Sequence, residues 1–151
     1  MVDKVRFAFT EVNPELGALS TLPYLPLVLT YENRSVNVSG LLDTGSTVNV
    51  LPYEIGLRLG AVWERQRLSV PLAGNLARFE ARALVLMANV EQFPTVELAF
   101  AWTRDRNAPL ILGHMNFFLA FDVCFYRSEL AFEISPKISL MEIVKPNIIL
   151  G

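Results

Sequence analysis

The sequence predicts an all-β sandwich or barrel with two short helices, on three observations. Apolar and polar residues alternate in many short runs, as they do in strands with one buried face. Residues that favour turns separate these runs at short intervals, which is typical of a sandwich or barrel. The chain has 151 residues, and at roughly 100–200 residues per domain this is the length of one domain.

Strands are expected along most of the chain. The alternating pattern predicts them at residues 5–10, 26–31 and 35–39. The polar residues 32–34 connect the last two strands, which therefore form a hairpin. Residues 78–90 alternate at first and are then nearly all apolar, which indicates a long strand with a more buried second half. Further strands are expected at residues 95–101, 109–112, 122–126, 129–134 and 138–144.

Two segments have the features of short helices. Residues 52–60 begin with Pro52 and end with Gly60, a common start and stop for a helix. Residues 114–121 are apolar and rich in Phe and Leu. Neither segment is long enough to change the all-β prediction.

Charge and cysteine content exclude several classes of protein. One cysteine cannot form a disulfide framework, and Cys124 with the single histidine, His114, cannot make a closed structural zinc site. A formal net charge of −2 excludes a polycationic nucleic-acid-binding protein. No apolar run reaches the roughly 18 residues of a membrane span, and the first residues lack the apolar core of a signal peptide. We therefore expect a cytoplasmic protein with no membrane and no nucleic-acid partner.

The composition is unusually apolar. Hydrophobic residues make up 52% of the chain and charged residues 19%, a high ratio for a soluble monomer. We therefore expect part of the apolar surface to be buried against a partner. Cys124 lies in an apolar strand and is expected to be a small buried side chain.

The segment with the most chemistry is Asp43-Thr44-Gly45-Ser46. Asp43 follows two leucines at the end of an expected strand, and an apolar strand resumes at residues 48–51. Gly45 permits a tight turn and the close approach of another chain, and the hydroxyls of Thr44 and Ser46 can bond the backbone or the carboxylate. These residues alone leave two alternatives: a functional carboxylate, or an ordinary turn that Asp43 caps.

In its context this segment resembles the active-site segment of aspartic proteases. Downstream, Ile111-Leu112-Gly113 followed by an apolar helix is similar to that family's second motif, an apolar-apolar-Gly strand with a helix behind it. The order of the motifs and the gap of about 70 residues between them resemble a single-lobed, retropepsin-like member rather than a two-lobed pepsin. The resemblance covers residues 22–134 and implies a single-lobed acid protease barrel with one or two short helices.

The resemblance implies hydrolysis of peptide bonds by two aspartates. Because two adjacent carboxylates cannot both be ionised, one acts as a base toward water and the other as an acid toward the peptide carbonyl. Asp3, Asp105 and Asp122 lack the Gly and hydroxyl setting of Asp43. The second carboxylate is therefore expected from Asp43 of a second copy, in a homodimer with a two-fold axis. No metal or organic cofactor is implied, and the substrate is a peptide or protein cleaved between apolar residues.

The resemblance also implies roles for the residues that follow Asp43. Thr44 is expected to reach across the dimer axis to the partner's backbone, and Gly45 to face the backbone of the substrate. Ser46 is expected to donate its hydroxyl to the carboxylate. Such a bond favours the charged form, lowers the pKa values of the pair and gives an acidic activity optimum.

His114 and Thr47 occupy two positions that commonly form an ion pair in retroviral members. The family often has an Arg just after the second-motif Gly and an acid four residues beyond the catalytic Asp. Since this chain has His and Thr there, we expect a His–Thr hydrogen bond, with His114 as a structural brace rather than a catalytic base.

Residues 68–82 are the candidate flap, the β-hairpin that closes over bound peptide in this family. Ala73, Gly74 and Asn75 are its expected tip, because Gly-Asn favours a turn and small residues allow movement and close contact with a peptide backbone. An ordinary surface hairpin is the alternative.

The C-terminal region has two expected roles. Ser135-Pro136-Lys137 predicts a boundary between one domain at residues 1–135 and an extension at residues 136–151. Because retroviral proteases interleave their chain ends in a dimer sheet, either the strand at 132–134 or the extension is expected to join such a sheet. Alternatively, the extension is a tail that occupies the cleft.

Three functions follow from these features. The first is a homodimeric aspartic endopeptidase, which the intact Asp43 motif favours. The second is a dimeric, protease-like module that binds peptides with little or no turnover. The third is a structural β-domain in which Asp43 only caps a turn.

Overall fold

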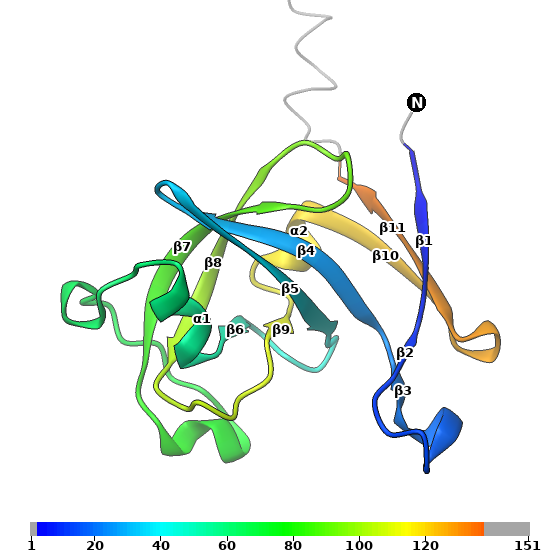
Figure 1. Cartoon of the computed structure of the whole chain (residues 1–151), viewed down its shortest axis with the longest axis horizontal. Coiled ribbons are helices and arrows are strands. Elements are labelled where there is room, and N and C mark those ends of the chain that lie inside the picture. The colour runs from blue at the N-terminus through cyan, green and yellow to red at the C-terminus, as the bar shows by residue number, and fades with distance from the viewer. Residues whose placement is uncertain (1–2, 138–151) are drawn as a thin grey trace, which may run out of the picture.

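The computed structural model describes residues 3–137 and is shown in Figure 1. It consists of a closed six-stranded barrel, a three-stranded sheet and a two-stranded ribbon, which confirms the all-β prediction. The strand expected at 138–144 and most of the extension at 136–151 lie outside the described residues. Among residues 3–137, no helix is long and apolar enough to span a membrane.

Six strands close the barrel in the order β4-β5-β9-β6-β8-β7. Their bounds are β4 Tyr24–Tyr31, β5 Arg34–Leu42, β6 Asn49–Leu51, β7 Ala81–Asn89, β8 Val96–Thr103 and β9 Ile111–Leu112. The predicted hairpin is confirmed, since β4 and β5 are antiparallel with Thr30 opposite Ser35. β9 is parallel to β5 and antiparallel to β6. It therefore lies between the two strands that flank Asp43 in the sequence.

Apolar side chains from alternate strand positions fill the barrel. Leu25, Leu27 and Leu29 of β4 are at most 5% exposed, as the two-residue period of a strand requires. The largest buried side chains are Trp102, Phe100, Phe117, Phe121 and Phe132. The last three come from outside the barrel but belong to the same cluster as the leucines, so the barrel and the three-stranded sheet share one core.

The helix α1 (Tyr53–Arg58) confirms the first predicted helix. It packs closely on β8, because a side chain at Gly56 would overlap the indole ring of Trp102. The Trp102 Nε1–H donates to the backbone oxygen of Tyr53 at 3.1 Å, so the indole is hydrogen bonded as well as buried. This contact fixes the chain just after β6.

The helix α2 is shorter than expected at residues 114–121 and covers only Phe117–Ala120. The backbone N–H groups of His114 and Met115 donate instead to Ser46 O at 3.0 Å and Thr47 O at 2.7 Å. Tertiary hydrogen bonds therefore override the helical preference of this apolar segment.

The two ends of the described chain meet in one sheet, in the order β1-β11-β10, at the right of Figure 1. The strands are β1 Val5–Ala8, β10 Phe121–Tyr126 and β11 Ala131–Pro136. In the central strand, Phe132 is opposite Phe7 on one side and Phe125 on the other. The expectation that the strand at 132–134 interleaves with a second copy is wrong, because β1 and β10 of the same chain occupy both of its edges.

A ribbon of two short strands, β2 (Thr10–Glu11) and β3 (Thr21–Leu22), projects at the lower right of Figure 1. The 3-10 helix η1 (Gly17–Ser20) lies between them. The strand expected at residues 5–10 is thus divided between the three-stranded sheet and this ribbon. Two other 3-10 turns are η2 (Trp63–Arg65) and η4 (Arg127–Glu129).

Cys124 is exposed, so the expectation that it is buried is wrong. It lies on β10 opposite Glu133 of β11, on the polar outer face of the three-stranded sheet. Its neighbour Val123 packs against the core instead, because successive side chains of a strand point to opposite faces.

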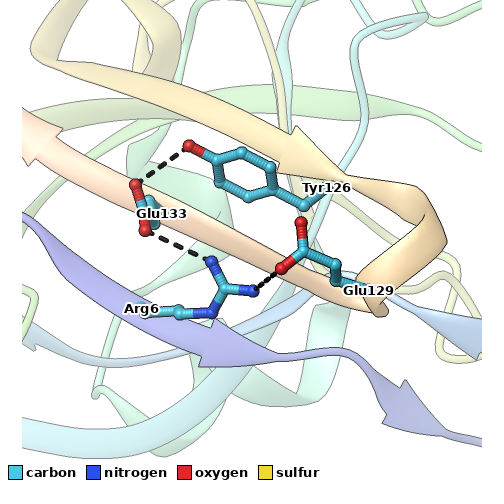
Figure 2. Close-up of polar contacts among 4 residues, drawn as sticks. All are labelled: Arg6, Tyr126, Glu129 and Glu133. Atoms are coloured by element: carbon cyan, nitrogen blue, oxygen red, sulfur yellow. Dashed lines mark hydrogen bonds and ion pairs between the residues drawn. The ribbon is translucent and has the colours of Figure 1, made fainter.

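Four polar side chains form a hydrogen-bonded group on this outer face, shown in Figure 2. Arg6 donates to Glu129 at 2.7 Å and to Glu133 at 3.3 Å, and the two carboxylates raise the pKa of Arg6. The Tyr126 hydroxyl donates to the other oxygen of Glu133 at 3.1 Å. The Cys124 side chain, and after it Glu133, raise the pKa of Tyr126 to about 12, because ionising the phenol breaks these hydrogen bonds and places like charges together.

We expect the phenol of Tyr126 to ionise with a pKa of about 12 instead of the ordinary value near 10. Since the raised pKa favours the native, protonated form, its contribution to stability is complete below the ordinary pKa near 10 and is lost as the pH rises through 12. Cys124→Ala and Glu133→Gln should each lower this pKa, as measured by tyrosinate absorbance against pH. Glu129→Gln is the control, because Glu129 bonds Arg6 and not the phenol. An equal shift in that variant would contradict the assignment.

Candidate active site

Asp43 follows β5, and its position is fixed by the backbone around it. Its N–H donates to Leu112 O of β9 at 3.0 Å. The carboxylate oxygen Oδ1 accepts the Gly45 N–H at 2.9 Å, and the backbone oxygen accepts the Ser46 N–H at 3.1 Å. The side chain is half-buried. This turn therefore presents a carboxylate at the end of a barrel strand while holding it by one of its oxygens.

The second motif, Ile111-Leu112-Gly113, lies directly against the Asp43 loop. β9 holds Ile111 and Leu112 beside the last residues of β5. At Gly113 a Cβ atom would lie 2.5 Å from Val48 O and 2.6 Å from Ser46 O. Backbone atoms cannot move aside as a flexible side chain can, so only glycine fits where the two segments cross.

Asn49 joins the two motifs from within the core, and the sequence interpretation missed it. It is fully buried, and its Oδ1 accepts the Gly113 N–H at 2.8 Å. Its Nδ2 donates to Ala99 O at 3.0 Å and to Asn116 Oδ1 at 3.3 Å, and that same Oδ1 accepts the Ala99 N–H at 3.0 Å. The available signal was a lone amide in the apolar strand at 48–51, since a buried polar side chain requires partners.

His114 braces the Asp43 loop, but not through the partner expected. Its Nε2 donates to Thr44 O at 2.7 Å, and this nitrogen carries a proton because a carbonyl oxygen only accepts. The ring also packs against Phe118, with 5.3 Å between ring centroids. The expected hydrogen bond between His114 and Thr47 is therefore replaced by the bond to Thr44 O. The backbone oxygen of Thr47 instead accepts the backbone N–H of Met115.

Ser46 does not assist the carboxylate. Its Oγ donates to Val48 O at 2.7 Å, and a hydroxyl has only one proton to donate. The expected donation from Ser46 to Asp43 is therefore wrong. The acidic activity optimum was expected from this donation, so the structure no longer gives a reason for it. The hydroxyl instead stabilises the turn in which Thr44 and Gly45 are exposed.

A groove of about 360 Å³ opens beside Asp43. It lies between the barrel and the candidate flap, and its lining consists of Asp43, Gly45, Ser46, Thr47, Val48, Val50, Ile111, Pro71, Leu72, Ala73 and Leu76. Of the three residues expected at the flap tip, Ala73 lines the groove, and Gly74 and Asn75 are exposed. Apart from the Asp43 loop, the walls are almost wholly apolar.

The candidate flap differs from the hairpin that was expected. Its ends are joined, since the Val70 N–H donates to Ala81 O at 2.9 Å. Its tip is the 3-10 helix η3 (Gly74–Arg78), and β7 begins only at Ala81. Leu72 and Leu76 pack on a small apolar cluster of the barrel. Burial of these leucines, rather than cross-strand pairing, therefore determines the conformation of the tip.

One carboxylate, that of Asp43, lines this groove in the part of the chain that the structure describes. Asp122 lines a different, smaller pocket of about 100 Å³ on the three-stranded sheet, together with Lys4 and Cys124. Among residues 3–137 no group of three or more His, Cys, Asp and Glu side chains is arranged to hold a metal ion.

The chain is similar in structure to a retropepsin-like aspartic protease from Rickettsia conorii, known from a crystal structure. The TM-score is 0.62 at 14% sequence identity, over 90% of this chain and 92% of that chain. This similarity shows the fold: a single-lobed, retropepsin-like barrel, as expected. No protein-family model matches the chain, and no curated protein sequence matches it.

Asn49→Ala is expected to lower the free energy of unfolding by about 2–4 kcal/mol, because it leaves the buried Gly113 N–H without its partner and removes the hydrogen bonds of the Asn49 amide to Ala99 O and Asn116 Oδ1. Urea denaturation of both proteins measures the difference. Asn37→Ala is the matched control, since Asn37 is exposed on strand β5 and should change stability by less than about 0.5 kcal/mol. Equal losses in the two variants would contradict a bracing role for Asn49.

Proposed function

We propose that this chain is an aspartic endopeptidase that acts as a homodimer, in which Asp43 of each copy supplies one of two catalytic carboxylates. One observation carries the proposal: in a retropepsin-like fold, Asp43 lies at an apolar groove on a turn that Gly113 and its motif hold in place. In this proposal Thr44, Gly45 and Ser46 support the active site by shaping that turn.

In this proposal a single chain supplies one of the two catalytic carboxylates. The proposed second copy places another Asp43 carboxyl close by, and the pair then shares one proton. The ionised member takes a proton from water as the water oxygen attacks the peptide carbonyl carbon, and the protonated member gives its proton to the carbonyl oxygen. The resulting gem-diol then breaks down: the carboxyl that took the water proton gives it to the amine nitrogen as the C–N bond breaks, and the other carboxylate takes a proton from a gem-diol hydroxyl, which restores the starting pair.

The walls of the groove indicate the class of substrate. Val48, Val50 and Ile111 line the barrel side, and Leu72 and Leu76 line the flap side. These side chains favour apolar residues on either side of the cleaved bond, because burial of apolar surface is the main attraction they offer. The exposed backbone at Gly45 is available to hydrogen bond an extended peptide.

Peptide entry requires the candidate flap to lift. Leu72 and Leu76 pack on the cluster of Val50, Ala108 and Ile111, which is the wall that an apolar substrate side chain would contact. Since Val70 and Ala81 remain joined at the base, the base acts as a hinge and the tip as a lid.

A second candidate is a peptide-binding module with little or no turnover. It is favoured by the three-stranded sheet, which the chain completes alone through β1 and β11. A chain that remained a monomer would keep the groove but lack the second carboxylate.

Asp43→Asn is expected to reduce peptide hydrolysis by roughly 100-fold or more, since positioned acid–base groups contribute at least that much. The assay uses a mixed library of apolar peptides over a range of pH, with products identified by mass spectrometry. Asp122→Asn is the matched control, because Asp122 is exposed and, among residues 3–137, forms an ion pair with Lys137 and with no other side chain. Specific activity should also rise with protein concentration. If wild type and Asp43→Asn release the same products, the protease proposal is wrong; binding without any hydrolysis favours the module.

Leu76→Ala is expected to increase opening of the lid, because it removes an apolar contact worth about 1 kcal/mol for a half-buried leucine. Amides at residues 72–79 should then exchange with deuterium roughly fivefold faster, as followed by mass spectrometry. Leu68→Ala is the control, since Leu68 is exposed and lies outside the groove. Unchanged exchange in Leu76→Ala would show that the contact does not hold the tip down.

A further inference from the structure

Residues 10–22, which contain the ribbon and η1, form a projection that we call the arm (Figure 1). It presents three large apolar side chains to solvent: Val12 is 57% exposed, Leu16 53% and Leu19 84%. Several exposed apolar residues on one short projection are unusual, because more than half of each side chain stays in water, and such groups commonly mark a surface that another molecule covers.

The arm is ordered by hydrogen bonds of its own. The Asn13 N–H donates to Ser20 Oγ at 3.0 Å, and the Ser20 hydroxyl donates to Asn13 O at 2.7 Å. Asn13 Oδ1 also accepts the Glu15 N–H at 3.0 Å. These bonds fix the turn from which Leu16 and Leu19 project, so the exposed leucines are held in a defined arrangement.

A second element ties the arm to the body of the molecule. Arg127 of η4 donates to Thr21 O at 2.7 Å and to Ala18 O at 3.0 Å, and its guanidinium lies 5.5 Å from the ring centre of Phe9. A loop held in this way loses little conformational entropy when it binds, which favours association.

The C-terminal end of the arm lies beside the candidate active site. Pro23, the residue after β3, accepts the N–H of Leu42 at 3.0 Å through its backbone oxygen, and Leu42 precedes Asp43. The arm therefore leaves the barrel at the strand end that carries the carboxylate. A second exposed apolar pair belongs to the segment crossing the same loop: Met115 is 60% exposed and Leu119 64%.

We propose that the arm is the element that joins two copies of this chain, with Leu16 and Leu19 of one copy packed on Met115 and Leu119 of the other. Two-fold symmetry makes each copy both donor and acceptor of an arm, so every dimer contains the contact twice. The choice of a second copy as the partner rests on the proposed function, because one chain provides only one Asp43. It also agrees with the pairing in the three-stranded sheet, where β1 and β10 of the same chain already occupy both sides of the central strand β11.

The test is the oligomeric state of three variants, measured by sedimentation equilibrium. The arm variant Leu16→Ser/Leu19→Ser should weaken the dimer roughly 100-fold or more, and the variant Met115→Ser/Leu119→Ser should do the same. Leu57→Ser is the control, because Leu57 is also exposed but lies on α1. Far-ultraviolet circular dichroism establishes that each variant is folded.

Mixing the two weakened variants tests directly whether the arm of one copy contacts Met115 and Leu119 of the other. A mixed dimer has one intact arm facing one intact acceptor, whereas each variant alone has none. Mixing should therefore restore association to a level between the variants and the wild type. Failure to restore it shows that the arm does not contact Met115 and Leu119, and overturns the proposal.

The outcomes separate the arm from the protease. A wild type that is monomeric at every concentration, or an arm variant that dimerises like wild type, overturns the arm proposal. Concentration-dependent hydrolysis in that same arm variant would still support the protease. If instead both variants dissociate, their mixture associates again, and the wild-type dimer hydrolyses no peptide, the arm proposal is supported and the protease proposal fails.

Discussion

The carbonyl oxygens of Ser46 and Val48 approach Gly113 so closely that no side chain fits between the two chain segments, and the arrangement around Asp43 depends on this crossing. The buried Asn49 amide receives the Gly113 N–H, and His114 holds the other side of the loop through Thr44 O. These contacts join segments more than 60 residues apart in sequence. The position of one carboxylate is therefore a property of the whole barrel, not of a local turn.

The rigidly held carboxylate of Asp43 contrasts with the groove beside it. The wall formed by the barrel is fixed by strands, whereas the flap side is held by apolar contacts of Leu72 and Leu76. Apolar contacts lack the directionality of hydrogen bonds, so they can be exchanged for contacts with a substrate side chain at little cost. A fixed carboxylate facing a replaceable apolar cover is the arrangement that the proposed hydrolysis needs.

Periodicity and turn chemistry were sufficient to predict the all-β class, the β4–β5 hairpin and α1, because these depend on local pattern. Periodicity and turn chemistry gave wrong predictions where contacts with residues distant in the sequence determine the local structure. Nothing near Ser46 indicates that its hydroxyl bonds Val48 O, and nothing near residues 114–116 indicates that bonds to the Asp43 loop shorten α2. Cys124 was misjudged because its neighbour Val123 packs against the core while Cys124 itself is exposed. The flap tip departs from a hairpin because burial of Leu76 in a cluster of distant residues outweighs the turn preference of Gly-Asn.

The middle position of β11 has a consequence for biosynthesis. β1 is synthesised well before its hydrogen-bonding partner, which lies more than 120 residues later in the chain, as the Arg6–Glu133 pair illustrates. Contacts of such long sequence separation are slow to form because the loop must close first. During translation the hydrogen-bonding edge of β1 and the apolar side chain of Phe7 therefore remain exposed until β11 has been synthesised. That interval is when a nascent chain is most exposed to chaperones and to misassembly with its neighbours.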